Sequence, residues 1–164
     1  KVFGSFVVGA PEEDWDSLQR TIAYARELDA QCSATIMTPF PGTPLFYRAI
    51  EEGLLEPTMQ YEGWNSYTAT MRTYALSRAD LTVARLWFRM ETLVPFRMRL
   101  AKRAGRKEMV RTALGLAPRV AVRTALRGYV AWRRLFPSAP AGPVARDETK
   151  KRAATLRRAL WQSR

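Results

Sequence analysis

The chain of 164 residues is 47% hydrophobic and can bury one sizeable core, but no uncharged stretch approaches the roughly 18 residues that a membrane-spanning helix requires. Its net charge of +12 is uneven: residues 1–70 carry 4 basic and 10 acidic side chains, and the remainder carries 23 and 5, which predicts two segments with different partners. A single cysteine, Cys32, and the absence of histidine exclude a disulfide framework and the usual zinc sites, and favour a reducing, cytoplasmic setting.

The first predicted element is a buried β-strand. Residues 2–9, VFGSFVVG, are mostly β-branched and aromatic, and the following Ala-Pro ends the strand with a turn. The chain opens with Lys1 and runs directly into this strand without the pattern of a signal peptide. We therefore expect the N-terminus to be a cut within a longer protein.

A helix and a second strand are predicted next. Between Glu12 and Asp29 acidic residues open a segment with apolar residues at helical spacing, and residues 32–38 are again β-type. Strand, helix and strand form a βαβ unit, whose strands run parallel. Because a parallel sheet is normally covered on both faces, more strands are expected to precede Lys1. Ligands of such sheets collect beyond the carboxyl ends of the strands, where GAPEED and TPFPGTP lie.

A stiff turn follows the second strand. In TPFPGTPLF, Pro39 keeps the residue before it extended, and the next Pro-Gly pair turns the chain. Thr43 is predicted to cap a helix that begins at Pro44 and ends at Gly53. Two uses are compatible: the turn holds a strand end rigid at the ligand edge, and it caps a strand and starts a helix.

Residues 57–95 are predicted to form an aromatic strap and a helix. Tyr61, Trp64 and Tyr67 are candidates for contact with substrate, although for each of them we favour surface packing. The sequence SRAD is a variant of the capping box and starts a helix that Pro95 ends or kinks.

Residues 96–136 are predicted to be a basic helical extension, broken at Gly105 and Pro118, and residues 137–164 a Pro/Ala linker with a basic tail. Three interpretations of the extension remain open: a solvated appendage packed by its apolar face, which we favour, a helix drawn to an anionic membrane, and a nucleic-acid-binding segment. The packed face would carry Leu114, Leu116, Val120, Val122 and Leu126.

Two motifs lie on the βαβ unit, in order and at a characteristic separation. The first, of the form GxFIxGxPxE, is matched by Gly4, Phe6, Gly9, Pro11 and Glu13. The second, TPxPGTxL, is matched by Thr38, Pro39, Pro41, Gly42, Thr43 and Leu45. Together they resemble the last third of the catalytic barrel of radical S-adenosylmethionine (SAM) enzymes, in the branch with an N-terminal cobalamin-binding domain. The resemblance covers roughly residues 1–95.

The resemblance implies an α/β fold, a partial (βα)6 barrel whose last two parallel strands lie in residues 1–56, followed by an α-helical C-terminal extension. The chain would be the C-terminal fragment of an enzyme that cleaves SAM with a [4Fe-4S] cluster to start radical chemistry, such as cobalamin-dependent methylation or cyclisation. Its partners would be the missing N-terminal part of the same enzyme and a small-molecule or lipid-like substrate. The implied SAM neighbours are Phe6, Val8, Gly9, Met37 and Thr38.

The chain departs from this family in its cysteines. The family's CxxxCxxC loop supplies three thiolates to the cluster, whereas this sequence has only Cys32, whose small neighbours predict inert burial. The sequence therefore provides no catalytic residue and no metal ligand, and predicts a fragment that is inactive alone. The alternative function is a non-enzymatic basic module that binds an anionic membrane or nucleic acid.

Overall fold

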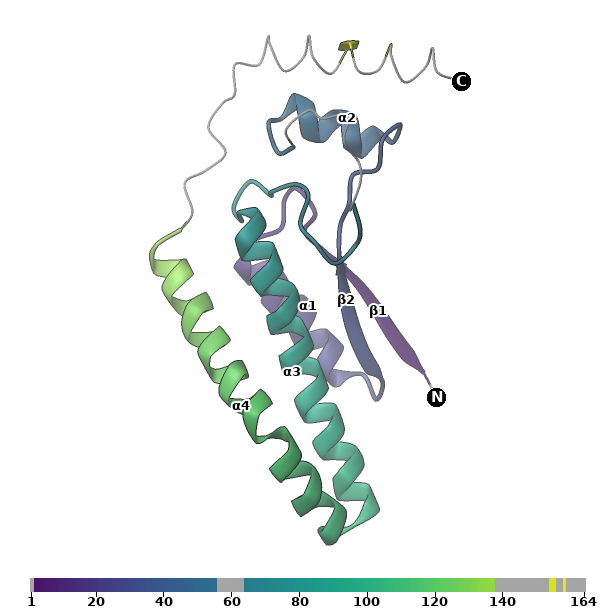
Figure 1. The fold of residues 1–164 in the computed structure, drawn as a ribbon, viewed down its shortest axis with the longest axis vertical. Coiled ribbons are helices and arrows are strands. Elements are labelled where there is room, and N and C mark those ends of the chain that lie inside the picture. The colour runs from purple at the N-terminus through teal and green to yellow at the C-terminus, as the bar shows by residue number, and fades with distance from the viewer. Residues whose placement is uncertain (1, 56–63, 138–153, 156–157, 159–164) are drawn as a thin grey trace. The chain divides into compact units, whose positions relative to one another are not determined.

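A computed structural model of the chain describes residues 2–55, 64–137, 154–155 and 158. Two strands and four helices lie in this part: β1 (Phe3–Val8), α1 (Trp15–Glu27), β2 (Gln31–Ile36), α2 (Pro44–Glu51), α3 (Arg78–Ala104) and α4 (Arg106–Leu135) (Figure 1). The elements divide into two compact units. Of the described residues, the first contains 2–8, Trp15–Thr35 and Val83–Phe136, and the second contains Gly9–Asp14, 36–55 and 64–82.

The predicted βαβ unit is present. β1 and β2 are neighbours in one two-stranded parallel sheet, and α1 connects them. The sequence prediction of adjacent strands joined by a helix is therefore confirmed, with each strand slightly shorter than expected. α1 begins at Trp15 rather than at Glu12, because the residues before it form a turn.

Helices α1 and α3 cover one face of this sheet. Phe6 of β1 packs against Tyr24 of α1 and Phe88 of α3, with ring centroids 6.3 and 5.2 Å apart. The alternate residues Phe3 and Val7 are 59% and 57% exposed, so the opposite face of β1 is uncovered in the part of the chain that the structure describes. The expected further strands, and with them the barrel, stay a prediction.

α3 and α4 lie side by side as an αα-hairpin (Figure 1). The predicted break at Gly105 is confirmed, because this glycine turns the chain with φ 109°. The prediction that Pro118 breaks a helix is wrong, because α4 runs through it. Pro95 does not end its helix either, because α3 continues to Ala104.

Packing on both sides of Pro95 explains why α3 continues. A helical proline removes one backbone hydrogen bond and costs about 3 kcal/mol. Before it, the Thr92 hydroxyl lies 3.3 Å from the carbonyl oxygen of Cys32 in β2. After it, the Arg99 guanidinium donates to the carbonyl oxygens of Arg26 and Leu28 at 2.7 and 3.0 Å. These contacts hold both halves of the helix on the first unit.

α4 packs through fewer apolar residues than the sequence suggests. Leu116 and Val130 are buried and Leu126 is partly buried. The prediction is wrong for three other side chains, which are exposed: Leu114, Val120 and Val122. The physical reason is the narrow contact stripe, since residues 116, 123 and 130 recur every seven positions, the spacing of a two-helix seam.

The second unit is organised around α2. Phe46, Ala49 and Ile50 of this helix form a buried cluster with Leu54, Leu55 and Met71. The Thr43 hydroxyl accepts the Phe46 N–H at 3.3 Å, and Pro44 occupies the first helical position, so the predicted cap is confirmed. The predicted capping box of α3 is also present, because Ser77 and Asp80 exchange hydrogen bonds between side chain and backbone.

Candidate functional site

The turn after β1 is closed by a carboxylate. Gly9 is buried with φ 92°, and its backbone N–H donates to the carboxylate of Glu13. The Glu13 N–H returns to the carbonyl oxygen of Ala10 at 2.9 Å. Burial raises the pKa of Glu13, although the Gly9 N–H favours its charged form. The sequence motif contained Glu13, but its role as the residue that fixes Gly9 emerges only from the structure.

Polar contacts connect this turn to the rest of the second unit. The Thr73 hydroxyl donates to the carbonyl oxygen of Glu13 at 2.8 Å, and the Tyr74 N–H donates to that of Pro11 at 2.9 Å. Arg48 of α2 pairs with Glu12 at 2.6 Å. The GAPEED segment is therefore held in place by α2 and by residues 73–74.

The end of β2 is tied to the aromatic strap. The Ile36 N–H donates to the carbonyl oxygen of Ser66 at 2.7 Å, and the Thr38 hydroxyl lies 3.2 Å from that of Asn65. Met37 packs against the α2 cluster, as does Trp64 of the strap. Of the other strap aromatics, Tyr67 is 61% exposed and Tyr61 lies outside the described residues.

The five implied SAM neighbours are distributed over both units. Gly9, Met37 and Thr38 belong to the second unit, where the first forms the turn and the other two contact the strap and the α2 cluster. Phe6 and Val8 belong to the first unit, on the face of β1 that the helices cover. The apolar side chains on the open face are those of Phe3 and Val7. Contact of the five residues with SAM stays a prediction.

Cys32 has the surroundings of a structural thiol. Its side chain is 5% exposed, and its Sγ lies 3.5 Å from the carbonyl oxygen of Ala25. Burial raises the pKa of the thiol, which disfavours the reactive thiolate. Among residues 2–55, 64–137, 154–155 and 158, no three His, Cys, Asp or Glu side chains are grouped so that they could hold a metal ion.

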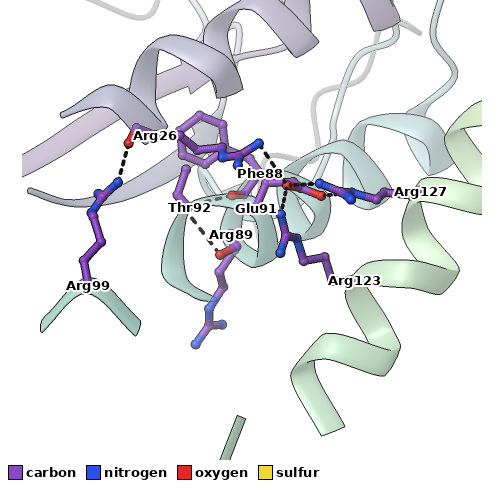
Figure 2. A network of polar contacts seen from close by, with 8 residues as sticks. All are labelled: Arg26, Phe88, Arg89, Glu91, Thr92, Arg99, Arg123 and Arg127. Carbon is purple, nitrogen blue, oxygen red and sulfur yellow. Dashed lines mark hydrogen bonds and ion pairs between the residues drawn. The ribbon is translucent and has the colours of Figure 1, made fainter. Parts of the chain in front are cut away.

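A buried ion cluster on α3 was not predicted from the sequence. Figure 2 shows three arginine side chains converging on Glu91, which is 2% exposed. Arg123 and Arg127 of α4 donate to it at 2.7 and 2.9 Å, and Arg26 of α1 lies 3.7 Å away. Burial favours the neutral carboxyl, but the hydrogen bonds from Arg123 and Arg127 outweigh it and hold the pKa at about 2. The sequence offered one signal for this cluster: acidic residues are rare after residue 70, so an acidic residue within the predicted helix stood out.

The comparisons with known proteins find a partial match. No protein-family model matches the chain. Over 66 residues the chain is 42% identical to an uncharacterized methyltransferase of Pyrococcus horikoshii. The matched region covers 40% of this chain and 14% of the relative, so the chain is similar to a small part of a longer protein with that name.

Proposed function

We propose that the chain is part of a SAM-dependent methyltransferase of the radical SAM type, whose cluster is bound outside these 164 residues. The observation that carries methyl transfer is the 42% identity over 66 residues to an uncharacterized methyltransferase. The radical SAM type rests on the two motifs and on the βαβ unit that bears them.

The strand ends fit SAM in part. Gly9 gives the chain the positive φ of the turn at the end of β1, although its own N–H is held by Glu13. The exposed side chain of Val7 is suited to an apolar purine face. The side chains of Glu13 and Thr38 form hydrogen bonds with backbone groups, so we propose that they stabilise the loops at the strand ends and do not bind SAM. When bound, SAM supplies an activated methyl group.

The residues of this chain do not fit a [4Fe-4S] cluster. A cluster needs several thiolates, and the one cysteine is buried with a raised pKa. We therefore place the cluster ligands, and any cobalamin site, in the remainder of the protein and derive no step through them.

The test compares two glycines that share a positive φ. In the complete protein, we expect Gly9→Ala to weaken SAM binding, measured by equilibrium dialysis, and to slow transfer of a labelled methyl group. The matched control is Gly105→Ala, since Gly105 has φ 109° but lies at the hairpin turn with open space around it. Equal effects of the two substitutions, or no SAM binding by the complete protein, would remove the support for this proposal.

A second candidate function is supported by α4. Arg106–Leu135 carries eight basic side chains and one acidic one. Six large apolar side chains of the same helix are exposed, and Leu114, Trp132 and Leu135 are the largest of them. A basic surface with exposed Leu and Trp is suited to an anionic membrane interface, whereas the aliphatic side chains of Leu114 and Leu135 offer no stacking surface to nucleic-acid bases. No helix of the described part is long and apolar enough to cross a membrane.

A further inference from the structure

A groove in the first unit runs between α1 and α4, with α3 as its floor. Its volume is about 290 Å³. Matching sets of residues line its two walls, Gln19, Ile22 and Arg26 on α1 and Arg127, Val130 and Arg134 on α4. Arg134 contacts Gln19, whereas Arg127 and Arg26 meet at Glu91, so the two helices run antiparallel along the groove. Each end of the groove is therefore polar.

The two ends differ in charge. At one end Arg134 is paired with Asp16 at 2.6 Å, and the charges balance. At the other end three guanidinium groups surround the single carboxylate of Glu91, which leaves an excess of two positive charges. An anion is therefore favoured at the Glu91 end, and a cation is disfavoured.

Arg26 has the most spare hydrogen-bonding capacity at this end, and Arg127 keeps its Nη1 donors. The side chain of Arg26, seen beside Glu91 in Figure 2, is 43% exposed. Its nearest guanidinium nitrogen is 3.7 Å from the Glu91 carboxylate, beyond hydrogen-bonding distance. Glu91 already accepts hydrogen bonds from Arg123 and Arg127 and does not depend on Arg26. Arg26 can therefore turn its planar fork of donors toward a carboxylate or phosphate without leaving a buried charge unpaired.

The middle of the groove is apolar. Ile22, Trp87 and Val130 lie there and are each less than a tenth exposed, while Ala23 and Ala131 leave the space open. The indole N–H of Trp87 is buried and has no hydrogen-bond partner among the described residues. A hydrocarbon chain or ring would displace water from this section.

We propose that this groove binds a small amphiphilic anion, with its carboxylate or phosphate at Arg26 and Arg127 and its apolar part along Ile22, Trp87 and Val130. The proposal does not depend on the proposed methyltransferase activity. Its recognition chemistry is shared by soluble organic acids and by lipids with a single phosphate, and the experiment separates these two sources.

The first experiment is calorimetric titration of the 164-residue chain at physiological salt. We expect octanoate and octyl phosphate to bind, and octanol, inorganic phosphate and octyltrimethylammonium to bind at least about tenfold more weakly, because each lacks one of the two features or carries the wrong charge. Octanol binding as tightly as octanoate would overturn the proposal. So would the absence of any binding.

Three variants locate the site. Arg26→Gln should weaken octanoate binding about tenfold, whereas Arg20→Gln, which removes the same charge from an exposed position of α1, should not. Ala23→Leu fills the groove without changing its charge and should weaken binding as well. Thermal unfolding of each variant checks its fold. Equal effects of Arg26→Gln and Arg20→Gln would show that the anion binds elsewhere.

Flotation with vesicles of phosphatidylcholine and phosphatidic acid distinguishes the two sources. If Arg26→Gln weakens flotation more than Arg20→Gln does, the groove accepts a lipid phosphate. If the difference between the two variants is confined to octanoate and octyl phosphate, the natural ligand is a soluble organic anion. Both results support the site, and a lack of difference with every ligand contradicts it.

Discussion

Gly4 has a packing role that its position in a sequence motif does not reveal. A Cβ built on Gly4 would lie 2.8 Å from the Sγ of Cys32, closer than real Cβ contacts allow. The thiol has little freedom to move, because it is buried between the carbonyl oxygens of Ala25 and Ala30. At this point β1 and β2 fit together because one residue lacks a side chain.

This contact gives a stability prediction. We expect Gly4→Ala to lower the free energy of unfolding by about 1–3 kcal/mol, the usual cost of overpacking. The double variant Gly4→Ala/Cys32→Ala should lose less than the sum of the single losses, because removal of the thiol makes room for the new methyl group. Urea unfolding of the wild type and the three variants measures these differences. Strictly additive losses would show that the two positions do not collide.

Glu91 gives a prediction about pH. Its pKa is about 2 in the folded chain and about 4.3 in an unfolded one, so the unfolded state binds the proton more tightly. Its contribution to stability is therefore complete above about pH 5 and is lost as the pH falls toward 2. At about 1.4 kcal/mol per pKa unit, it amounts to roughly 3 kcal/mol.

Glu91→Gln is the variant that isolates this contribution. It should be less stable than the wild type at pH 7, and its stability should fall less between pH 5 and pH 2. Thermal or urea unfolding at several pH values provides the comparison. An exposed carboxylate, as in Asp29→Asn, serves as the control and should change the profile little, because surface ion pairs contribute little. Parallel pH profiles of the wild type and Glu91→Gln would contradict the assignment.

At the scale of elements, helix starts could be predicted from the sequence but helix lengths could not. Thr43 before Pro44 and Ser77 before Asp80 are local signals, and the structure uses both. The continuation of α3 past Pro95 depends on contacts with residues about 60–70 positions earlier, which local rules do not contain. Tertiary packing therefore overrode the local preference for a break.

The candidate site was predictable to a similar extent. The glycine turn at Gly9 follows from its place at a strand end, and the structure confirms its positive φ. The sequence did not determine toward which face of the sheet each β1 side chain points, because a shift of one residue in register reverses the two faces of a strand. In the structure the side chain of Phe6 lies toward the helices, and the side chain of Val7 lies on the open face. The ion cluster around Glu91 could not be predicted from the sequence, because its partners come from helices that are far apart in the sequence.

The exposed residues of α4 give a prediction at the same scale. Leu114 and Trp132 are eighteen residues apart, which is five turns at 3.6 residues per turn, so they share one side of the helix. If that side lies on an anionic membrane, the 164-residue chain should float with vesicles of phosphatidylcholine and phosphatidylserine and not with phosphatidylcholine alone. Higher salt should weaken binding, because exposed charges are screened within about 10 Å at 0.1 M.

Substitutions on α4 distinguish membrane binding through this apolar surface from general attraction between charges. Leu114→Glu and Trp132→Glu should weaken flotation strongly. Val120→Glu adds the same negative charge to an exposed position about a third of a turn from Leu114 and should weaken it less. Equal losses for the three variants would leave only general electrostatic attraction. Tighter binding to DNA than to vesicles would favour the nucleic-acid interpretation instead.

At the scale of the whole molecule, the proposed chemistry requires more protein than this chain. The apolar side chains of Phe3 and Val7 lie on an uncovered face of β1, and a parallel sheet normally has both faces covered. The chain matches 14% of the length of its methyltransferase relative. The helical hairpin and its basic surface are, by contrast, fully contained in Arg78–Leu135. Cofactor chemistry and the α4 surface can therefore be tested on different lengths of protein.

We expect the isolated chain to bind no iron–sulfur cluster. The 164-residue chain, reconstituted without oxygen with iron and sulfide, should hold no stoichiometric [4Fe-4S] cluster and should release no 5′-deoxyadenosine from SAM. The reason is its single thiol, which is buried and has a raised pKa, whereas a cluster needs several thiolates. Visible absorption and chromatography of the products provide the two measurements. The complete protein, treated in the same way, should show both the cluster and the nucleoside, and Cys32→Ala in that protein should leave the cluster content unchanged. Loss of the cluster in Cys32→Ala, or a cluster in the isolated chain, would show that this thiol is a ligand.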